Sequence, residues 1–153
     1  MAKDWYEIKN VETVDSPSIA LYLEHLNYNI NEMITLVDGQ TERLMPHIKT
    51  NKMPKVMELL LESGITNFKA STIAEAEIAA EAGANSVLIA HQLVGPKIDR
   101  LLRLIKHYPE TQFSTILDNE DSAELLNQKA LGQELTVPIY IDINNGMDRS
   151  GIE

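Results

Sequence analysis

Residues 67–118, NFKASTIAEAEIAAEAGANSVLIAHQLVGPKIDRLLRLIKHYPETQFSTILD, decide the fold class, because short apolar runs alternate there with longer amphipathic ones. The short runs lie at 67–71, 86–91 and 112–118, and each has the length of a buried strand. Strands that alternate with helices pair in parallel and are joined by crossover helices. The stretch therefore predicts an α/β fold with a parallel sheet.

The same unit continues on both sides of this stretch. Apolar runs at 44–49 and 137–144 extend the series, so strands are expected to start near residues 43, 67, 86, 112 and 136. Before the first of them, apolar residues at spacings of three and four predict a helix from Ser16 to Val37, with Ser16 as its cap. About five strand-and-helix units account for the chain.

The helices between the strands are marked by their end residues. Pro54 is expected to begin one helix and Gly64 to end it. Thr72 and Glu75 have the spacing of a capping box at the start of the next helix. Helices are predicted at 55–62, 76–82, 97–107 and 119–131.

Two architectures fit this period. An eight-unit barrel takes about 250 residues, so a chain of 153 residues corresponds to about five of its eight units. An open doubly wound sheet of five strands fits equally well on periodicity alone. No Gly-x-Gly-x-x-Gly turn follows the first expected strand, which favours the barrel. We therefore expect an incomplete (β/α)8 TIM-type barrel of about five parallel strands.

Composition excludes several classes of function. Lys and Arg number 13 against 23 Asp and Glu, and the resulting charge of −10 argues against binding of nucleic acid or anionic membranes. The absence of cysteine excludes disulfides, thiolate metal sites and cysteine nucleophiles. No apolar run approaches the roughly 20 residues of a membrane span, and the first residues are too polar for a signal peptide. We expect a cytoplasmic globular protein.

Polar residues follow the expected strands, at the edge where parallel α/β folds carry their chemistry. Lys49 is the strongest candidate, because partial desolvation at a strand end inside a barrel favours the neutral amine that attacks a carbonyl. The alternative is an ordinary solvated lysine. The turn NNGMDR at 144–149 offers amide donors and the permanent cation Arg149, which can keep a phenolate ionised. Its alternative is a surface turn with an exposed arginine.

Two histidines lie near the same edge. His47 and His91, with Asp118 or Asp142, make a metal site conceivable, but no ligand spacing supports one and hydrogen-bonding roles are favoured. No metal-ligating residue is therefore assigned in this chain. Residues 71–72 precede a helix whose N-terminus could bind an anion, but capping explains them without a ligand.

Several blocks together carry a specific resemblance. They are DSP at 15–17, LMPHIKTNK at 44–52, FKASTIAEAE at 68–77, LIAHQLVGP at 88–96 and DINNGMDRSGI at 142–152. They resemble the fold-type III pyridoxal-phosphate enzymes, specifically the D-threonine aldolase and D-serine dehydratase branch of the alanine racemase N-terminal barrel family. The resemblance covers nearly the whole chain from residue 15 on.

The resemblance implies roles for individual residues. Lys49 would bind pyridoxal 5′-phosphate covalently through its amine, and Arg149 would face the phenolic oxygen of the cofactor. His47 and Thr50 belong to the same motif and are expected at the cofactor without an assigned role. Met45 stands where arginine is usual before Pro-His, and the loss of an arginine that orders the site would reduce its efficiency.

The resemblance also implies an activity. It is that of a D-threonine aldolase-like lyase, which cleaves D-β-hydroxy amino acids to glycine and an aldehyde. The alternatives are a D-serine dehydratase-like lyase, a pyridoxal-phosphate-binding protein without catalysis, and a fragment whose surface serves only association. An amino-acid racemase fits the lysine block less well.

The same resemblance implies parts that lie elsewhere. In the family, a divalent metal such as Mn²⁺ activates the β-hydroxyl, and its ligands come from a C-terminal β-domain that completes the site across a homodimer. We expect residues 1–153 to be the N-terminal portion of such a barrel, with the remaining barrel units, the β-domain and the metal ligands outside the chain. Little or no turnover is then expected from this chain alone.

Overall fold

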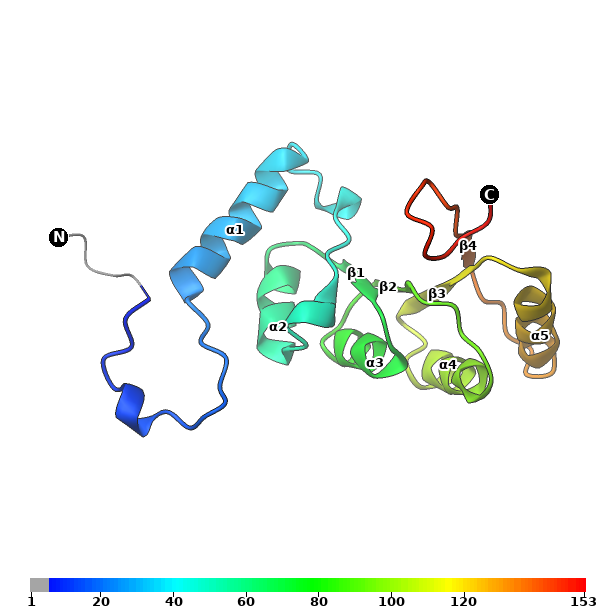
Figure 1. Cartoon of the computed structure of the whole chain (residues 1–153), viewed down its shortest axis with the longest axis horizontal. Helices are drawn as coiled ribbons and strands as arrows, with labels where there is room; N and C mark the ends of the chain where they lie inside the picture. The colour runs from blue at the N-terminus through cyan, green and yellow to red at the C-terminus, as the bar shows by residue number, and fades with distance from the viewer. Residues whose placement is uncertain (1–5) are drawn as a thin grey trace. The chain divides into compact units, whose positions relative to one another are not determined.

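The computed structural model describes residues 6–153 and separates into two units, divided after Gly39. The described part of the first unit contains a 3-10 turn, η1 (Val11–Thr13), and helix α1 (Leu23–Leu36) (Figure 1). The prediction that this helix begins at Ser16 is wrong. Asp15 accepts a hydrogen bond from the Ser16 N–H on its side chain and one from the Ser18 hydroxyl on its carbonyl. Such local bonds compete with helical ones.

The second unit is built on a parallel sheet of four strands. In the sheet the strands follow their sequence order, and each pairs in parallel with the next. They are β1 (Asn67–Ala70), β2 (Ser86–Ile89), β3 (Gln112–Leu117) and β4 (Ile139–Ile141). The expected α/β fold with parallel pairing is confirmed.

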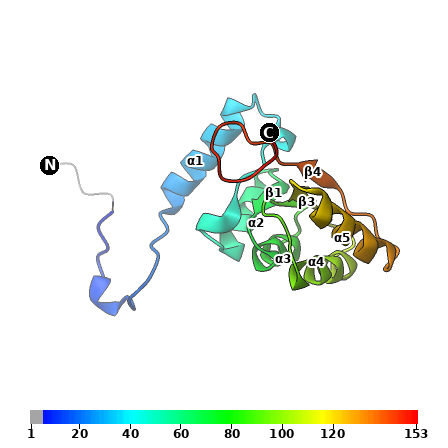
Figure 2. The ribbon, with the colours of Figure 1, turned by 45° about the vertical axis from the view of Figure 1, so that its right-hand side comes forward.

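Four helices connect or precede the strands. Figures 1 and 2 show them side by side along one face of the sheet, in chain order. They are α2 (Pro54–Glu62), α3 (Ile73–Glu81), α4 (Pro96–His107) and α5 (Glu120–Leu131). None of the helices within residues 6–153 combines the length and hydrophobicity that crossing a bilayer requires.

This topology decides between the two architectures. A doubly wound sheet reverses its strand order at a switch point and carries helices on both faces. Here the order is β1-β2-β3-β4, and α2 to α5 cover one face only. The sheet is therefore an incomplete barrel, as expected.

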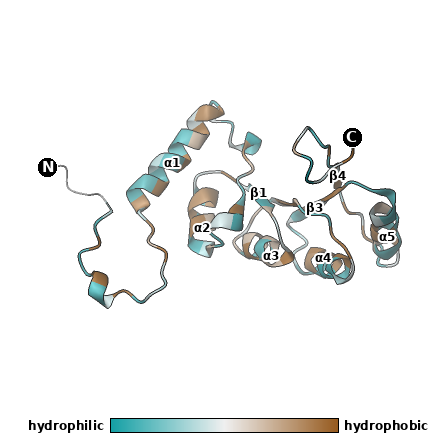
Figure 3. Cartoon of the chain, in the orientation of Figure 1, coloured by the Kyte–Doolittle hydropathy of each residue, from teal (hydrophilic) through white to brown (hydrophobic). Residues whose placement is uncertain are grey.

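The core lies between the sheet and these helices. Phe68 of β1 pairs with Val87 of β2, which pairs with Phe113 of β3, and all three side chains are buried. The alternate residues Lys69 and Leu88 point to the opposite face and are half-buried. In Figure 3 hydrophobic and hydrophilic colours alternate along the helices, as expected for helices that pack one face on a sheet.

The end residues of the helices act as the sequence indicates. Pro54 occupies the first turn of α2. The Thr72 hydroxyl accepts a hydrogen bond from the N–H of Glu75 at 3.2 Å and caps α3. Asn119 caps α5 by accepting from the Ser122 N–H at 2.9 Å. These positions were predictable because the groups that cap a helix lie within a few residues of its start.

The strand predicted at 44–49 is wrong except for a single bridge between His47 and Lys69. Pro46 has no N–H to donate to a ladder, although its carbonyl accepts from the Lys69 N–H at 3.0 Å. The chain instead forms two 3-10 turns, η2 (Thr41–Arg43) and η3 (Ile48–Thr50). The sheet thus has four strands and one bridge rather than five strands, and Lys49 does not close a strand.

The last strand is also shorter than predicted. The run at 137–144 forms a strand only over Ile139–Ile141, with pairing continued where the Asp142 N–H donates to the Leu117 carbonyl at 2.9 Å. Beyond it the chain folds into a loop whose ends meet, at residues 142–152.

Candidate functional site

A cavity of about 480 Å³ opens at the carboxyl ends of the strands. Every segment that follows a strand contributes to its wall, and the residues include Ser71 after β1, His91 after β2, Asp118 after β3 and Asp142 after β4. Because parallel strands end at a common edge, residues up to about 70 positions apart in sequence meet there. The expectation that polar residues gather at this edge is confirmed.

Lys49 lies on this cavity, in turn η3. Its side chain is exposed, so the partial desolvation expected from a position inside a barrel is not found in this chain. Lys69 of β1 lines the same cavity as a second amine. Thr50 also lies in η3 but is not among the residues that line the cavity, and its part in cofactor binding stays a prediction.

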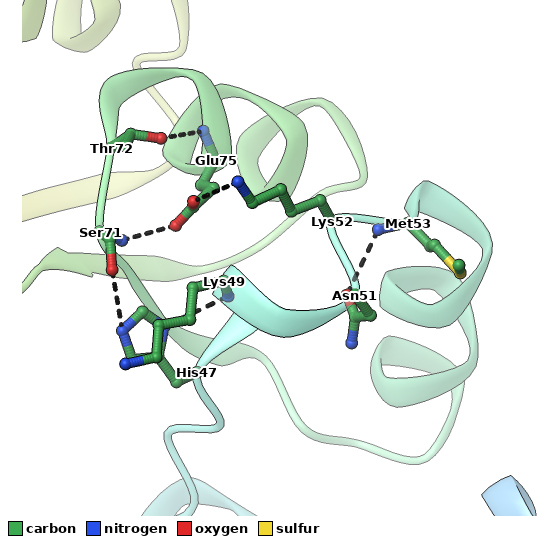
Figure 4. A network of polar contacts seen from close by, with 8 residues as sticks. All are labelled: His47, Lys49, Asn51, Lys52, Met53, Ser71, Thr72 and Glu75. Carbon is green, nitrogen blue, oxygen red and sulfur yellow. Dashed lines mark hydrogen bonds and ion pairs between the residues drawn. The ribbon is translucent and has the colours of Figure 1, made fainter. Parts of the chain in front are cut away.

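His47 is held from both ring nitrogens (Figure 4). Its Nδ1 accepts a hydrogen bond from the backbone N–H of Lys49 at 3.3 Å, and its Nε2 lies 3.2 Å from the Ser71 hydroxyl. A backbone N–H can only donate, so Nδ1 is unprotonated and the neutral ring carries its proton on Nε2. The hydrogen-bonding role favoured for His47 is confirmed.

Electrostatics favour the same neutral form. Burial lowers the pKa of His47 below its ordinary value of 6.5, and the positive charges of Lys49 and Lys69 lower it further. The imidazole is therefore a neutral acceptor that caps the Lys49 turn at neutral pH.

The loop at 142–152 is closed by its own polar groups. The Asn144 side-chain oxygen accepts from the N–H groups of Gly146 and Asp148, both at 3.1 Å. Its amide nitrogen donates to the Asp148 carboxylate at 2.9 Å. The Asn144 N–H donates to the Ile152 carbonyl at 2.8 Å and so joins the two ends of the loop. Arg149 lies on this loop and lines the cavity.

Two glycines of the loop differ in what surrounds them. Gly146 has a φ of 104° and open space where a Cβ would stand. Gly151 has a φ of 97°, and a Cβ there would lie 2.5 Å from the Asn144 nitrogen. The Gly151 N–H donates to the Asp118 carboxylate at 3.3 Å, which ties the loop to the end of β3. Gly151 therefore permits the close approach that brings Arg149 to the cavity.

Gln92 is a wall residue to which sequence reasoning assigned no role. Its side-chain oxygen accepts from the Asp118 N–H at 3.1 Å, and its nitrogen donates to the Ser122 hydroxyl at 2.9 Å. It thus joins the ends of β2 and β3 to the start of α5. No local pattern reveals such a bridge, because its partners lie 26 and 30 residues away.

The carboxylate of Glu75, in the first turn of α3, lies at the N-terminal end of that helix. Glu75 accepts a hydrogen bond from the Ser71 N–H at 2.7 Å and pairs with Lys52 at 3.3 Å. Burial alone would raise the pKa of Glu75, but the Ser71 N–H and the Lys52 ammonium outweigh it, so the pKa lies below its ordinary value of 4.5. With Thr72 as the cap, the capping interpretation of residues 71–72 is confirmed.

The cavity wall combines amines, a guanidinium and carboxylates. Lys49, Lys69 and Arg149 face Asp118 and Asp142 around one space. Among residues 6–153, no group of three or more histidine or acidic side chains is arranged to hold a metal ion. The arrangement can bind an anion and offers a primary amine to a carbonyl compound.

Comparison with known proteins identifies relatives of the chain. The family described as alanine racemase, N-terminal domain, matches residues 21–153. The D-threo-3-hydroxyaspartate dehydratase of Delftia sp. (strain HT23) is 27% identical over 140 residues, which are 92% of this chain and 36% of that protein.

Solved structures of similar proteins match the chain as well. The crystal structure of D-threonine aldolase from Filomicrobium marinum matches 92% of this chain and 37% of its own, with a TM-score of 0.81 and 26% identity. The structure of an alanine racemase-like protein from Idiomarina loihiensis matches 100% of this chain and 39% of its own, with a TM-score of 0.81 and 27% identity. The chain thus spans a little over a third of the length of these relatives.

The two loop glycines give a matched test of the Arg149 loop. We expect Gly151→Ala to break the loop closure, because it adds a backbone clash to the strain of a positive φ, whereas Gly146→Ala adds strain alone. Amide hydrogen exchange at Asn144 and Ile152 should be at least about tenfold faster in Gly151→Ala than in Gly146→Ala. Equal exchange in the two variants would contradict the packing assigned to Gly151.

His47 gives a pH-dependent prediction. Its pKa in the folded chain is lowered from 6.5, so as the pH falls below 6.5 the unfolded chain binds the proton before the folded one. The contribution of His47 to the free energy of unfolding should therefore be fully present above pH 6.5. It should be lost as the pH falls through the lowered pKa. Urea unfolding between about pH 7.5 and about pH 5.5 measures this decline.

His47→Asn is the control for that measurement. An asparagine oxygen can accept the Lys49 N–H as the imidazole does, but it does not titrate. The variant should lose less stability than the native chain over the same pH range. An identical pH dependence in both chains would show that His47 does not cause the decline.

Proposed function

This chain belongs to the alanine racemase N-terminal domain family, and on that premise we propose that it forms the lysine-bearing part of a pyridoxal 5′-phosphate-dependent lyase for D-β-hydroxy amino acids. One observation carries the proposal: Lys49 and Arg149, from opposite ends of the second unit, line one cavity. The names of the aldolase and dehydratase relatives support the reaction class.

The donor set fits this cofactor. A cavity of about 480 Å³ lies in the range of small-molecule sites. Lys49 offers an exposed primary amine to the cofactor aldehyde, and Arg149 and Lys69 offer positive charge to its anionic groups. When bound, pyridoxal phosphate supplies an electron sink for the bond that breaks at Cα of the amino acid.

The residues of the chain have separate parts in this proposal. Lys49 binds the cofactor through its amine nitrogen, and Arg149 keeps the phenolic oxygen ionised by its permanent charge. His47, neutral and bonded at both nitrogens, orients the backbone of the Lys49 turn. Asp142 lines the cavity as a carboxylate that can hold a proton near the substrate.

We propose the aldolase reaction first, in which a D-β-hydroxy amino acid gives glycine and an aldehyde. The dehydratase reaction is the second candidate, favoured by the 27% identity with the D-threo-3-hydroxyaspartate dehydratase. In it, water leaves the substrate, and hydrolysis then releases ammonia and a 2-oxo acid. The two reactions share the cofactor lysine and differ in the bond held for cleavage, so Lys49 supports both equally. A pyridoxal-phosphate-binding protein without turnover is the remaining alternative.

The proposal assigns the whole activity to a longer protein. Residues 1–153 then form the N-terminal portion of the barrel, a divalent metal such as Mn²⁺ is held outside this chain, and the active protein is a homodimer. Two observations support further units beside β4. The chain covers only a little over a third of the length of its relatives, and Ile139 and Ile141 are exposed in β4, which is an edge strand.

The cofactor site can be tested on the chain itself. Pyridoxal phosphate added to the purified chain should produce an absorption band at about 420 nm that is lost in Lys49→Ala. Lys69→Ala is the comparison variant, because Lys69 is a second lysine on the same cavity. It should need more cofactor, since it loses a positive charge, but should keep the band at saturating pyridoxal phosphate. A band that survives in Lys49→Ala at saturating cofactor would remove Lys49 from its proposed role.

Turnover is tested on the full-length protein that contains this chain. With pyridoxal phosphate and Mn²⁺ it should consume D-threonine or D-threo-3-hydroxyaspartate, and Lys49→Ala should abolish this activity. Glycine as a product identifies the aldolase, whereas ammonia and a 2-oxo acid identify the dehydratase. A Lys49-dependent band without consumption of either substrate would instead indicate a binding protein without turnover.

A further inference from the structure

One buried carboxylate touches the C-terminal flank of the Lys49 turn and reaches the N-terminal flank through Ser71. Glu75 lies in the first turn of α3 and is 3% exposed. Its Oε2 accepts from the Ser71 N–H at 2.7 Å, and its Oε1 lies 3.3 Å from the Lys52 Nζ (Figure 4). The carboxylate thus bridges two segments that are separate in the chain: the β1–α3 turn and the segment that carries Lys49.

The Lys52 contact holds the C-terminal flank of the turn. Lys52 lies two residues after the end of η3 and has a φ of 52°, a left-handed conformation that costs a residue with a side chain about 1 kcal/mol. Its side chain is 57% exposed, yet the ammonium turns back to the buried carboxylate. This ion pair favours the backbone conformation in which the chain leaves the Lys49 turn.

The Ser71 contact holds the N-terminal flank. Glu75 fixes the Ser71 backbone at 2.7 Å, and the Ser71 hydroxyl lies 3.2 Å from the His47 Nε2. The His47 Nδ1 then accepts the Lys49 N–H at 3.3 Å. A continuous series of contacts therefore runs from the Glu75 carboxylate to the backbone of Lys49 itself.

We propose that Glu75 is a positioning residue for Lys49, holding both flanks of its turn so that the lysine is presented to the cavity in one conformation. The inference rests on the proposed function, because it gives Lys49 the cofactor-binding role. Glu75 is not among the residues that line the cavity, so it acts through Lys52, Ser71 and His47 and not by contact with a ligand.

A role as a helix cap alone does not account for these contacts. In a capping box the glutamate at the third position bonds the N–H of the cap residue itself. Here the carboxylate bonds the N–H of Ser71, one residue before the cap Thr72, and its second oxygen reaches Lys52 in another segment. The Thr72 hydroxyl already caps α3 by accepting the Glu75 N–H.

The first test needs no cofactor. Nitrogen NMR of the His47 ring distinguishes its two neutral tautomers, and the native chain should show the proton on Nε2. Glu75→Gln removes the charge with little change of shape, and it should populate both tautomers because an amide oxygen accepts the Ser71 N–H more weakly than a carboxylate does and cannot form an ion pair with Lys52. Glu77→Gln is the matched control, an exposed glutamate of the same helix, and it should leave the tautomer unchanged.

The second test measures the reactivity of Lys49. The fraction of Lys49 trapped by pyridoxal phosphate and borohydride, mapped by mass spectrometry, should fall about tenfold in Glu75→Gln and stay within about twofold in Glu77→Gln. Lys52→Met should lower trapping in the same direction, and Lys52→Arg, which retains the cation, should restore it. Lys52 is exposed, so these two variants carry the test even where Glu75→Gln does not fold.

The outcomes separate this inference from the proposed function. A Glu75→Gln chain that is less stable but keeps the native tautomer and native Lys49 trapping would reduce Glu75 to a helix cap and overturn the inference. Native trapping in a folded Lys52→Met chain would overturn it as well. A native chain that never reacts at Lys49, while Glu75→Gln still changes the His47 tautomer, would overturn the proposed function and leave the positioning by Glu75 standing.

Discussion

The parallel register of β1 to β4 is the constraint on which the candidate site depends. Because each strand pairs in parallel with the next, all four strands end at one edge of the sheet. The side chains that follow them, from Ser71 to Asp142, therefore face one cavity although they are far apart in the sequence. The bridge between His47 and Lys69 brings the Lys49 turn to the same edge.

Local signals explain which elements the sequence predicts. Helices α2 to α5 begin and end near the residues expected, because proline, capping side chains and apolar spacing act within a few positions. Two of the errors, the helix start at Ser16 and the strand at 44–49, occur where apolar spacing continues through residues that bond elsewhere. Asp15 bonds the backbone next to it, and Pro46 lacks a donor, so neither segment completes the element that its apolar residues suggest.

Some residues of the candidate site were likewise predictable from local patterns, and others were not. Lys49, Arg149 and His47 were predictable from their motifs, and the structure brings all three to one cavity. The Glu75 bridge was not predictable, because the spacing of Thr72 and Glu75 indicates a capping box and hides the contact with Lys52. The functional group of a site is visible in a local pattern, whereas the groups that hold it are found only when distant segments are folded together.

The net charge of −10 and a cationic site are compatible, because they act over different distances. Screening limits the field of exposed charges to about 10 Å at moderate ionic strength, so a large polyanion senses many of the 23 acidic residues. A small anion inside the cavity senses mainly the charges of the wall, where the three cations Lys49, Lys69 and Arg149 outnumber the two carboxylates of Asp118 and Asp142. The same composition that argues against nucleic acid is therefore consistent with a phosphate-bearing cofactor, and the wall residues rather than the net charge decide which anions bind.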